Sequence, residues 1–561
     1  MGRKDLSLEK IKALRGRKIV EQIFYNGSII TMSMKTAAEE LKKAPEAVLV
    51  RDGVIIETGI MDEVLEAASD QVVKRNLNGN CLMPSFIDTH SHFVMNGQMS
   101  VWADLSDCES FEDIIAVLTA YIQTNKITEE GIVLGYGYDH NFLKEGEHPD
   151  KGVLDQVSSE LPIFILHISA HMGCVNSAAL RMAGMDKQTP DPQGGVIGRI
   201  KGSDEPSGYV EEAGMNLIQQ TLFPKMKIDC HQMMSEMQDI YLENGVTTVQ
   251  DGASTEADIN LLVQMSASGA LRLDVVAYPL MSALSLDYLI QNENLYKTYV
   301  NRFRIGGCKL VLDGSPQGRS AWMSEPYLGG EEENYCGYPW LKDCDVQSYV
   351  KQAAEQKWQI LAHCNGDAAS EQFINAYEKA VRDLDSKEDL RPVMIHCQTV
   401  RNDQLERMER LHMIASVFVG HVWYWGDIHM KNFGTERGQH ISPVRDAIDR
   451  GVIVTFHQDT PVTKPNMLHS IWCAVNRISR NGNVIGEDQA IEVYDALKSV
   501  TINAAFQYFE ENTKGSIEKG KRADFVILDQ SPLEIDKKDI KNIKILETIK
   551  DGETIYVNKR L

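Results

Sequence analysis

Eight short apolar runs rich in β-branched residues alternate with segments of helical pattern along most of the 561-residue chain. Near-continuous apolar character is typical of parallel strands that are covered on both faces. Eight such strands alternating with helices form the pattern of a (β/α)8 barrel. We therefore predict an α/β fold, a TIM barrel, with strands near residues 81–88, 245–251, 271–278, 304–313, 358–363, 391–396, 413–419 and 452–459.

The predicted strands are unevenly spaced. Residues from about 94 to 240 separate the first run from the second, and a segment of that length is too long for an ordinary loop. We predict an insertion there that has structure of its own. Among the helical patterns, one places Val346, Val350 and Ala353 on a single face, and we expect Asp345 to be its N-cap.

The two ends of the chain resemble each other in kind. Short alternating runs near both ends are broken by Asn-Gly and Asp-Gly steps at Asn26, Asp52 and Asp551. Such steps are strong signals for hairpin turns. We predict that residues 18–80 and 505–561 form one composite β-sandwich, which the chain leaves to build a barrel from residues 81–504 and then re-enters.

Charge and composition exclude several classes of partner. The chain has 57 basic and 80 acidic residues, a net charge of −23, whereas nucleic acids and anionic membranes are bound through an excess of Lys and Arg. No apolar run approaches the roughly 18 residues of a membrane helix, and the N-terminus has no apolar signal segment. The ten cysteines form no C-x-x-C pair, which favours reduced thiols. We expect a cytoplasmic enzyme that acts on a small molecule; a homodimer is left open.

Side chains that bind metals recur at the ends of the predicted strands. Alternate residues of an extended segment point the same way, so His90 and His92 can face one ion. A single histidine at a strand end is more often a hydrogen-bonded core residue than a ligand. A structural protein gains nothing by gathering several buried polar groups at one rim. We therefore predict a metal site from the residues that end these strands: His90, His92, His363, His396 and Asp459.

Longer motifs carry a family resemblance over nearly the whole chain. The segments are PSFIDTHSHF, KLVLDGSPQGRSA, AHCNGDAA, IHCQTVRNDQLERM, HVWYWGDIH, TFHQDTPV and KGSIEKGKRADFVILD. In this order they resemble the YtcJ-like branch of the amidohydrolase superfamily, which includes N-substituted formamide deformylase. Ser85 stands where the usual motif has glycine, at a turn position where we expect little effect on function.

The resemblance implies a role for each ligand position. His90 and His92 match the ligands of the more buried metal, and His363 and His396 match those of the second. Asp459 matches an aspartate that touches metal and moves protons. The resemblance also implies that Lys309 is carboxylated and bridges two ions; the alternative is an unmodified lysine paired with Asp313. The mixed His and carboxylate set favours zinc, as one or two ions.

The resemblance implies hydrolysis of a carbon–nitrogen bond other than a peptide bond. Two ions about 3.5–4 Å apart can share a water and lower its pKa from about 15.7 to about 7. The hydroxide would attack a carbonyl, while Asp459 takes the water proton and gives it to the departing amine. We expect His421, after the seventh strand, either to hydrogen-bond the oxyanion or to serve only as a packing residue.

We expect the substrate to be a small N-acyl or N-formyl amine. At least one ring among Trp423, Tyr424 and Trp425 should face the metals and stack on an apolar substituent. Arg319, with Gln317, would anchor a polar group of the substrate or else form a loop salt bridge. The insertion should close over the site, with His171 in contact with substrate.

Two other readings stay open. The same barrel and metal core could serve a cyclic amide, a deaminase substrate or an ester, because specificity lies in the loops. The chain could also be a non-catalytic assembly protein that keeps the barrel, a class in which ligand positions are lost. Every ligand position is filled in this chain, which favours the enzyme.

Overall fold

The centre of the protein is a set of parallel strands. The computed structural model describes residues 21–128, 131–225, 230–281, 288–329, 334–384 and 388–559. Two sheets, β16-β15-β14-β7 and β17-β18-β19-β20-β21, contain only parallel pairs, and a parallel bridge between Leu280 and Lys309 links them. The strands are β7 (Phe86–Ile87), β14 (Val246–Ser254), β15 (Asp274–Pro279), β16 (Phe303–Ile305), β17 (Gly307–Val311), β18 (Gln359–Cys364), β19 (Val393–His396), β20 (Ile414–Val417) and β21 (Val454–Phe456). Each of the eight predicted segments therefore contains a strand.

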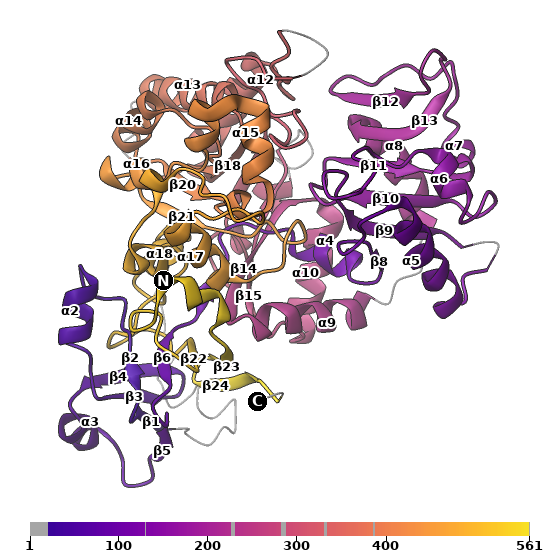
Figure 1. The fold of residues 1–561 in the computed structure, drawn as a ribbon. Coiled ribbons are helices and arrows are strands. Elements are labelled where there is room, and N and C mark those ends of the chain that lie inside the picture. The colour runs from indigo at the N-terminus through magenta and orange to yellow at the C-terminus, as the bar shows by residue number, and fades with distance from the viewer. Residues whose placement is uncertain are drawn as a thin grey trace.

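Helices follow most of these strands and cover the sheets (Figure 1). They are α9 (Cys230–Glu243), α10 (Glu256–Ser268), α12 (Asp343–Glu355), α13 (Asp367–Leu384), α14 (Asn402–Arg410), α15 (His421–Gln439), α16 (Val444–Asp449), α17 (Met467–Asn476), α18 (Val493–Ser499) and α19 (Ile502–Gln507). Helix α12 has Val346, Val350 and Ala353 on its buried face, as expected. Asp345 is not the N-cap, because the helix begins two residues earlier and Asp345 lies within its first turn. An acidic residue there still complements the helix dipole.

Two predicted strands are each divided in two. At Ser85 the backbone changes partners: its N–H donates to Asp524, and the next N–H, of Phe86, donates to Gly245. Residues 81–84 therefore join a sheet formed with the C-terminal part of the chain, and residues 86–87 join the parallel sheet. At Gly306 the backbone passes so close to Tyr278 that a Cβ would lie 2.4 Å from the tyrosine ring, and the strand is interrupted there.

The two chain ends pack as two sheets around one core (Figure 1). Phe24 of one sheet meets Phe525 of the other edge to face, with 5.6 Å between ring centroids. Asp52-Gly53 and Asp551-Gly552 have positive φ at both residues, as type I′ hairpin turns require. Residues 18–20 and 560–561 of the predicted sandwich lie outside the described residues. The strands are β1 (Glu21–Tyr25), β2 (Ser28–Ile29), β3 (Ala47–Arg51), β4 (Val54–Gly59), β5 (Val73–Asn76), β6 (Cys81–Pro84), β22 (Phe525–Leu528), β23 (Ile545–Lys550) and β24 (Glu553–Val557), with helices α2 (Ala37–Lys42) and α3 (Met61–Ala67).

The long segment after β7 holds a third body of structure, which lies beside the parallel sheets in Figure 1. Its sheet has the order β12-β13-β11-β10-β9-β8 and buries apolar clusters on both faces. Its elements are α4 (Phe93–Met99), β8 (Ala103–Asp104), α5 (Phe111–Thr124), β9 (Val133–Tyr138), α6 (Lys151–Asp155), β10 (Ile163–His167), β11 (Met172–Val175), α7 (Ser177–Ala183), β12 (Gly195–Arg199), β13 (Pro206–Glu212) and α8 (Ala213–Leu222).

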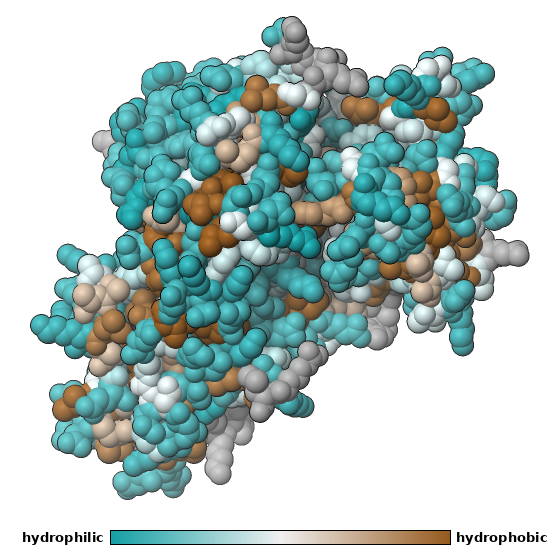
Figure 2. All heavy atoms as spheres, in the orientation of Figure 1, coloured by the Kyte–Doolittle hydropathy of each residue, from teal (hydrophilic) through white to brown (hydrophobic). Residues whose placement is uncertain are grey.

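The hydrophilic surface and the free cysteine thiols agree with what the composition predicts. The face drawn in Figure 2 is mostly hydrophilic, with apolar groups scattered over it. Within the described residues, no helix is both long and apolar enough to cross a membrane. The nine cysteines whose side chains the structure describes are free thiols, and seven of them are buried.

Candidate active site

The ends of the central strands bring the six predicted ligand residues to one cavity. His90 and His92 follow β7, Lys309 lies in β17, and His363 lies in β18. All line the same cavity together with His396, which ends β19, and Asp459, which follows β21. Parallel strands end at one edge of a sheet, so residues far apart in sequence converge there.

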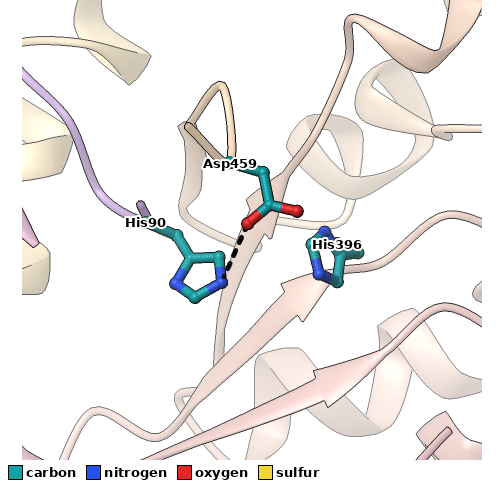
Figure 3. Close-up of side chains that lie close together, drawn as sticks. All are labelled: His90, His396 and Asp459. Carbon is teal, nitrogen blue, oxygen red and sulfur yellow. Dashed lines mark ion pairs between the residues drawn. The ribbon is translucent and has the colours of Figure 1, made fainter. Parts of the chain in front are cut away.

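Asp459 lies between His90 and His396 (Figure 3). Its Oδ1 atom is 3.3 Å from Nε2 of His90 and 3.4 Å from Nε2 of His92. Donor atoms of His90, His396 and Asp459 all lie within 4.8 Å of one another. Burial raises the pKa of the Asp459 carboxyl, but His92, His396 and His90 outweigh it and hold that pKa well below its usual range.

The donor set fits a divalent cation. Oδ1 of Asp459 is buried and has no hydrogen-bond partner among the described residues. Buried polar atoms are rarely left without a partner, and an unpartnered carboxylate oxygen facing imidazole nitrogens is the environment that a cation satisfies.

Hydrogen bonds behind His90 and His92 hold their rings in the ligand orientation. Nδ1 of His90 lies 2.6 Å from Oε1 of Gln250, whose amide donates to the carbonyl of Thr89 at 2.7 Å. Nδ1 of His92 lies 2.7 Å from the carbonyl of Gly252. Each Nδ1 therefore donates its proton to an oxygen, which leaves the Nε2 lone pair to face the cavity. The absence of a side chain at Gly252 leaves room for the His90 ring, because a Cβ at this position would lie 2.6 Å from that ring.

A carboxylate orients His363 in the same manner. Nδ1 of His363 lies 3.0 Å from Oδ1 of Asp313, which also accepts the backbone N–H of Asn365, while Oδ2 accepts the N–H of Gly366. Carboxylate–histidine pairs of this kind fix the tautomer of a metal ligand. The carboxylate of Asp313 is thereby occupied, and the structure does not pair it with Lys309.

His396 and Lys309 complete the floor of the cavity. Nδ1 of His396 lies 3.2 Å from Nε2 of His457, whose Nδ1 lies 2.9 Å from the hydroxyl of Ser416. Nζ of Lys309 lies 3.3 Å from Nε2 of His90. Burial lowers the pKa of Lys309 to about 7, although Asp459 opposes the shift.

The cavity has a polar floor and largely apolar walls. Its volume is about 230 Å³. The walls come mainly from the segment between β7 and β14, which supplies Met99, Trp102, Leu166, Met215 and Phe223, and Trp340 joins them from the loop before α12. Polar groups on the same side are His171, Glu212, Asn216 and Gln219.

The sequence profile described as "Amidohydrolase family" matches residues 75–556, which is most of the chain. The chain belongs to the amidohydrolase family. It is 27% identical over 549 residues to YtcJ of Bacillus subtilis, in a match that covers 96% of this chain and 99% of the relative. It is 26% identical to N-substituted formamide deformylase of Arthrobacter pascens, over 94% of this chain and 98% of that enzyme.

A solved structure supports the fold of this amidohydrolase. An uncharacterised metal-dependent hydrolase from Pyrococcus horikoshii superposes with a TM-score of 0.73. The two chains are 23% identical, and the superposition covers 92% of this chain and 99% of the other. The similarity therefore extends from the terminal sheets to the central strands.

His171 lies in the cavity and has a partner that the sequence did not reveal. Its Nδ1 lies 3.0 Å from Oε2 of Glu212, and its ring centroid lies 5.3 Å from that of His363. Burial lowers the pKa of His171, but the carboxylates around it, Glu212 foremost with Asp459 and Asp313, together outweigh burial and raise that pKa. Glu212 has φ 52° and ψ −120°, a sparsely populated conformation that marks functional sites more often than ordinary turns.

The structure does not bring Trp423 or Trp425 to this cavity. Trp425 is fully buried, and its Nε1 donates to Oδ2 of Asp139 at 3.0 Å. Trp423 packs edge-on against Trp472, with Lys541 over its face. Tyr424 lies against Trp425 and His469, so none of the three rings lines the cavity in the described structure. The expectation of an aromatic ring facing the metals from this segment is therefore corrected: the segment begins helix α15, whose turn sends successive side chains to different neighbours.

Arg319 also lies away from the residues that line the cavity. Its Nε donates to Oδ1 of Asn432 at 2.9 Å, which ties the loop after β17 to helix α15. Gln317 is buried in the same loop. The described contacts therefore give Arg319 a structural role, in which it joins the loop after β17 to helix α15.

His421 is the first residue of α15 and is buried. Its Nδ1 lies 3.1 Å from Nε2 of His429, and its ring stacks on that of His429. Burial and His429 hold the pKa of His421 well below its usual value, so the ring is neutral. His421 is not among the residues that line the cavity in the described structure.

Proposed function

We propose that this protein is a metal-dependent hydrolase that cleaves the carbon–nitrogen bond of a small N-acyl or N-formyl amine. One observation carries the proposal: four histidines and Lys309 line one largely apolar cavity together with Asp459, whose Oδ1 atom has no hydrogen-bond partner among the described residues. A relative of similar length is named N-substituted formamide deformylase.

The proposal includes the architecture. We assign β7 and the strands from β14 to β21 to a (β/α)8 barrel of residues 81–504, with an insertion at about 94–240 and a composite sandwich of residues 18–80 and 505–561. Hydrogen bonds between the two end strands' loops support closure: Asp459 N–H donates to the carbonyl of His90, and His92 N–H donates to that of Thr460.

Zinc is the metal we propose, because histidine nitrogens and a carboxylate oxygen suit its borderline character. His90, His92, His363, His396 and Asp459 would hold one or two ions. A bound divalent ion supplies Lewis acidity, which polarises a carbonyl and lowers the pKa of water.

Lys309 is proposed to be carboxylated. Its depressed pKa leaves a large neutral fraction near pH 7, and a neutral amine is the form that reacts with carbon dioxide. In that step a bond forms between Nζ and the carbon of CO₂, and Nζ releases one proton. The resulting carbamate is a hard oxygen ligand like aspartate.

Side chains of the protein would carry out the proton transfers of the reaction. The carboxylate of Asp459 would take a proton from the attacking water and deliver it to the amine nitrogen as the C–N bond breaks, since an unprotonated amine leaves poorly. His171, held by Glu212, would donate a hydrogen bond to the substrate from the opposite wall. His421 is kept as a candidate for orienting the developing oxyanion.

The cavity favours a small substrate with an apolar substituent. Trp102, Phe223 and Trp340 can supply the aromatic contacts that we had expected from the segment after the seventh strand. The test is a comparison of kcat/KM for N-benzylformamide-like compounds, their N-acetyl analogues, cyclic amides, aminopurines, esters and short peptides on zinc-loaded protein. Highest activity on formyl or acetyl amines is expected; highest activity on another class would replace the substrate assignment, and no activity on any would favour a non-catalytic role.

A further inference from the structure

A second cluster of ligand-type side chains lies in the segment between β7 and β14. Asp139 and His140 directly follow β9, and His167 is the last residue of the neighbouring parallel strand β10. The pairing of Tyr138 with His167 brings these strand ends together. None of the three belongs to the residues that line the cavity described above.

The three donor atoms have the separations of a metal site. Nδ1 of His140 lies 3.2 Å from Nε2 of His167, Nε2 of His167 lies 3.5 Å from Oδ1 of Asp139, and that oxygen lies 3.8 Å from Nδ1 of His140. Tetrahedral ligands at zinc distances of about 2.0–2.2 Å have donor atoms roughly 3.3–3.6 Å apart. An ion placed between the three atoms would need only small shifts of the side chains.

Neighbouring groups orient these side chains. Oδ1 of Asp139 accepts hydrogen bonds from the backbone and the amide of Asn141, both at 2.9 Å, and Oδ2 accepts the indole N–H of Trp425. Nδ1 of His167 lies 2.9 Å from the hydroxyl of Ser169. The backbone N–H of Ser169 also donates to this Nδ1, at 3.1 Å, which places the proton of the metal-free ring on Nε2. Nε2 would have to give up that proton, with Nδ1 then donating to the hydroxyl, before it could act as a ligand.

The charge of Asp139 would also favour a bound cation. Its side chain is 4% exposed, and among the described residues no lysine or arginine lies within salt-bridge distance of it; its ion-pair partners are His140 and His167. The hydrogen bonds from Asn141 and Trp425 hold the carboxylate in its charged form, and a divalent ion would add a full positive charge beside it. His140, at 18% exposure, leaves a path by which an ion can enter.

We propose that Asp139, His140 and His167 bind one divalent transition-metal ion, zinc or a similar borderline cation, at a site separate from the proposed catalytic centre. A water would fill the fourth position. An ion here would tie the end of β9 to the end of β10, two residues before the stretch 169–171 that lines the cavity. The competing arrangement is a hydrogen bond between the two histidines, with Ser169 N–H donating to Nδ1 of His167 at 3.1 Å.

The test uses the full-length protein, stripped with a chelator, reloaded with Zn²⁺ alone and analysed for bound zinc per chain. His140→Asn should bind one ion fewer than the unmodified protein. His412→Asn is the matched control, because His412 is exposed and has φ 51°, a conformation that asparagine adopts readily. His90→Asn should lose zinc from the other site and keep this ion, so the two sites are distinguished without any activity measurement.

Equal zinc content in His140→Asn and His412→Asn would overturn the proposal. If His140→Asn does not fold, crystals of the unmodified protein soaked in Zn²⁺ give the answer by anomalous scattering. A peak between Oδ1 of Asp139, Nδ1 of His140 and Nε2 of His167 is expected. Absence of that peak, with the two histidines hydrogen-bonded to each other, would refute the site.

Discussion

Nζ of Lys309 lies 3.3 Å from Nε2 of His90, and Lys309 is 1% exposed. An ammonium in this position would be repelled by cations bound to the surrounding histidines, whereas a carbamate would attract them. We expect the electron density of the zinc-loaded protein to show a planar three-atom group beyond Nζ. A bare amine with a single ion nearby would contradict carboxylation.

The same proposal predicts chemical rescue. Lys309→Ala should lose activity, and a short carboxylic acid added with zinc should restore part of it, because the acid supplies the missing oxygen ligand. The control is His90→Ala, in which a nitrogen donor is lost; the same acid should leave its activity unchanged. Equal rescue of both variants would show that the acid acts elsewhere.

Carboxylation of the metal-free protein should depend on pH in a defined direction. The pKa of Lys309 is lowered to about 7, so its neutral, reactive form increases as pH rises through that value. An ordinary lysine, with a pKa of about 10.4, stays protonated there. At constant pressure of ¹³C-labelled carbon dioxide, the carbamate NMR signal should grow between about pH 6 and pH 8 and be absent in Lys309→Ala.

Removal of a histidine ligand should separate metal binding from folding. His90→Ala and His363→Ala are expected to lower zinc content and to reduce kcat by several orders of magnitude, with circular dichroism unchanged. The folded core does not depend on these two side chains, because they face the cavity. Full activity in metal-stripped protein would contradict the metal mechanism.

Gln250 should control metal affinity without contacting the metal. Gln250→Leu removes the acceptor for Nδ1 of His90 and is expected to weaken zinc binding roughly 10- to 100-fold, measured by competition with a chelator. Gln359→Leu is the matched control. Gln359 is an equally buried glutamine whose amide donates to Arg391 and Gln507, so its loss should reduce stability and leave zinc affinity unchanged.

The cavity walls should set substrate preference. Trp340→Ala is expected to raise KM for N-benzylformamide roughly 2- to 10-fold, the loss of an aromatic contact of about 0.5–1.5 kcal/mol. Trp423→Ala removes a similar side chain that packs against Trp472 and should leave KM unchanged. If Trp423→Ala raised KM and Trp340→Ala did not, the segment after β20 would be the part of the protein that contacts the substrate.

The strands, and the convergence of the candidate ligand residues on one cavity, could be predicted from the sequence because both signals are local. An apolar run marks each central strand, and His90, His92, His363, His396 and Asp459 stand at or directly after a run. Family membership of the chain confirmed the resemblance drawn from these motifs.

Features that depend on pairing between distant segments were missed. Glu212 reaches His171 because β11 and β13 are antiparallel neighbours, and no local pattern records that pairing. Similarly, Trp423 and Trp425 were placed by position alone, although the backbone conformation at their segment decides where the rings point. The division of the first run at Ser85 follows from its two hydrogen-bonding partners, Asp524 and Gly245, which are far apart in the sequence.

The composite sandwich has a consequence for synthesis of the chain. The amide of Gln22 donates to the carbonyl of Gly552, 530 residues later, and the amide of Gln507 donates to that of Thr89, 418 residues earlier. On the ribosome, the first strands therefore emerge long before their partners, and contacts so distant in sequence form slowly. Thr89 precedes His90, so the carbonyl next to this candidate ligand receives its hydrogen bond only after residue 507 has been translated, when all six candidate ligand residues are already part of the chain.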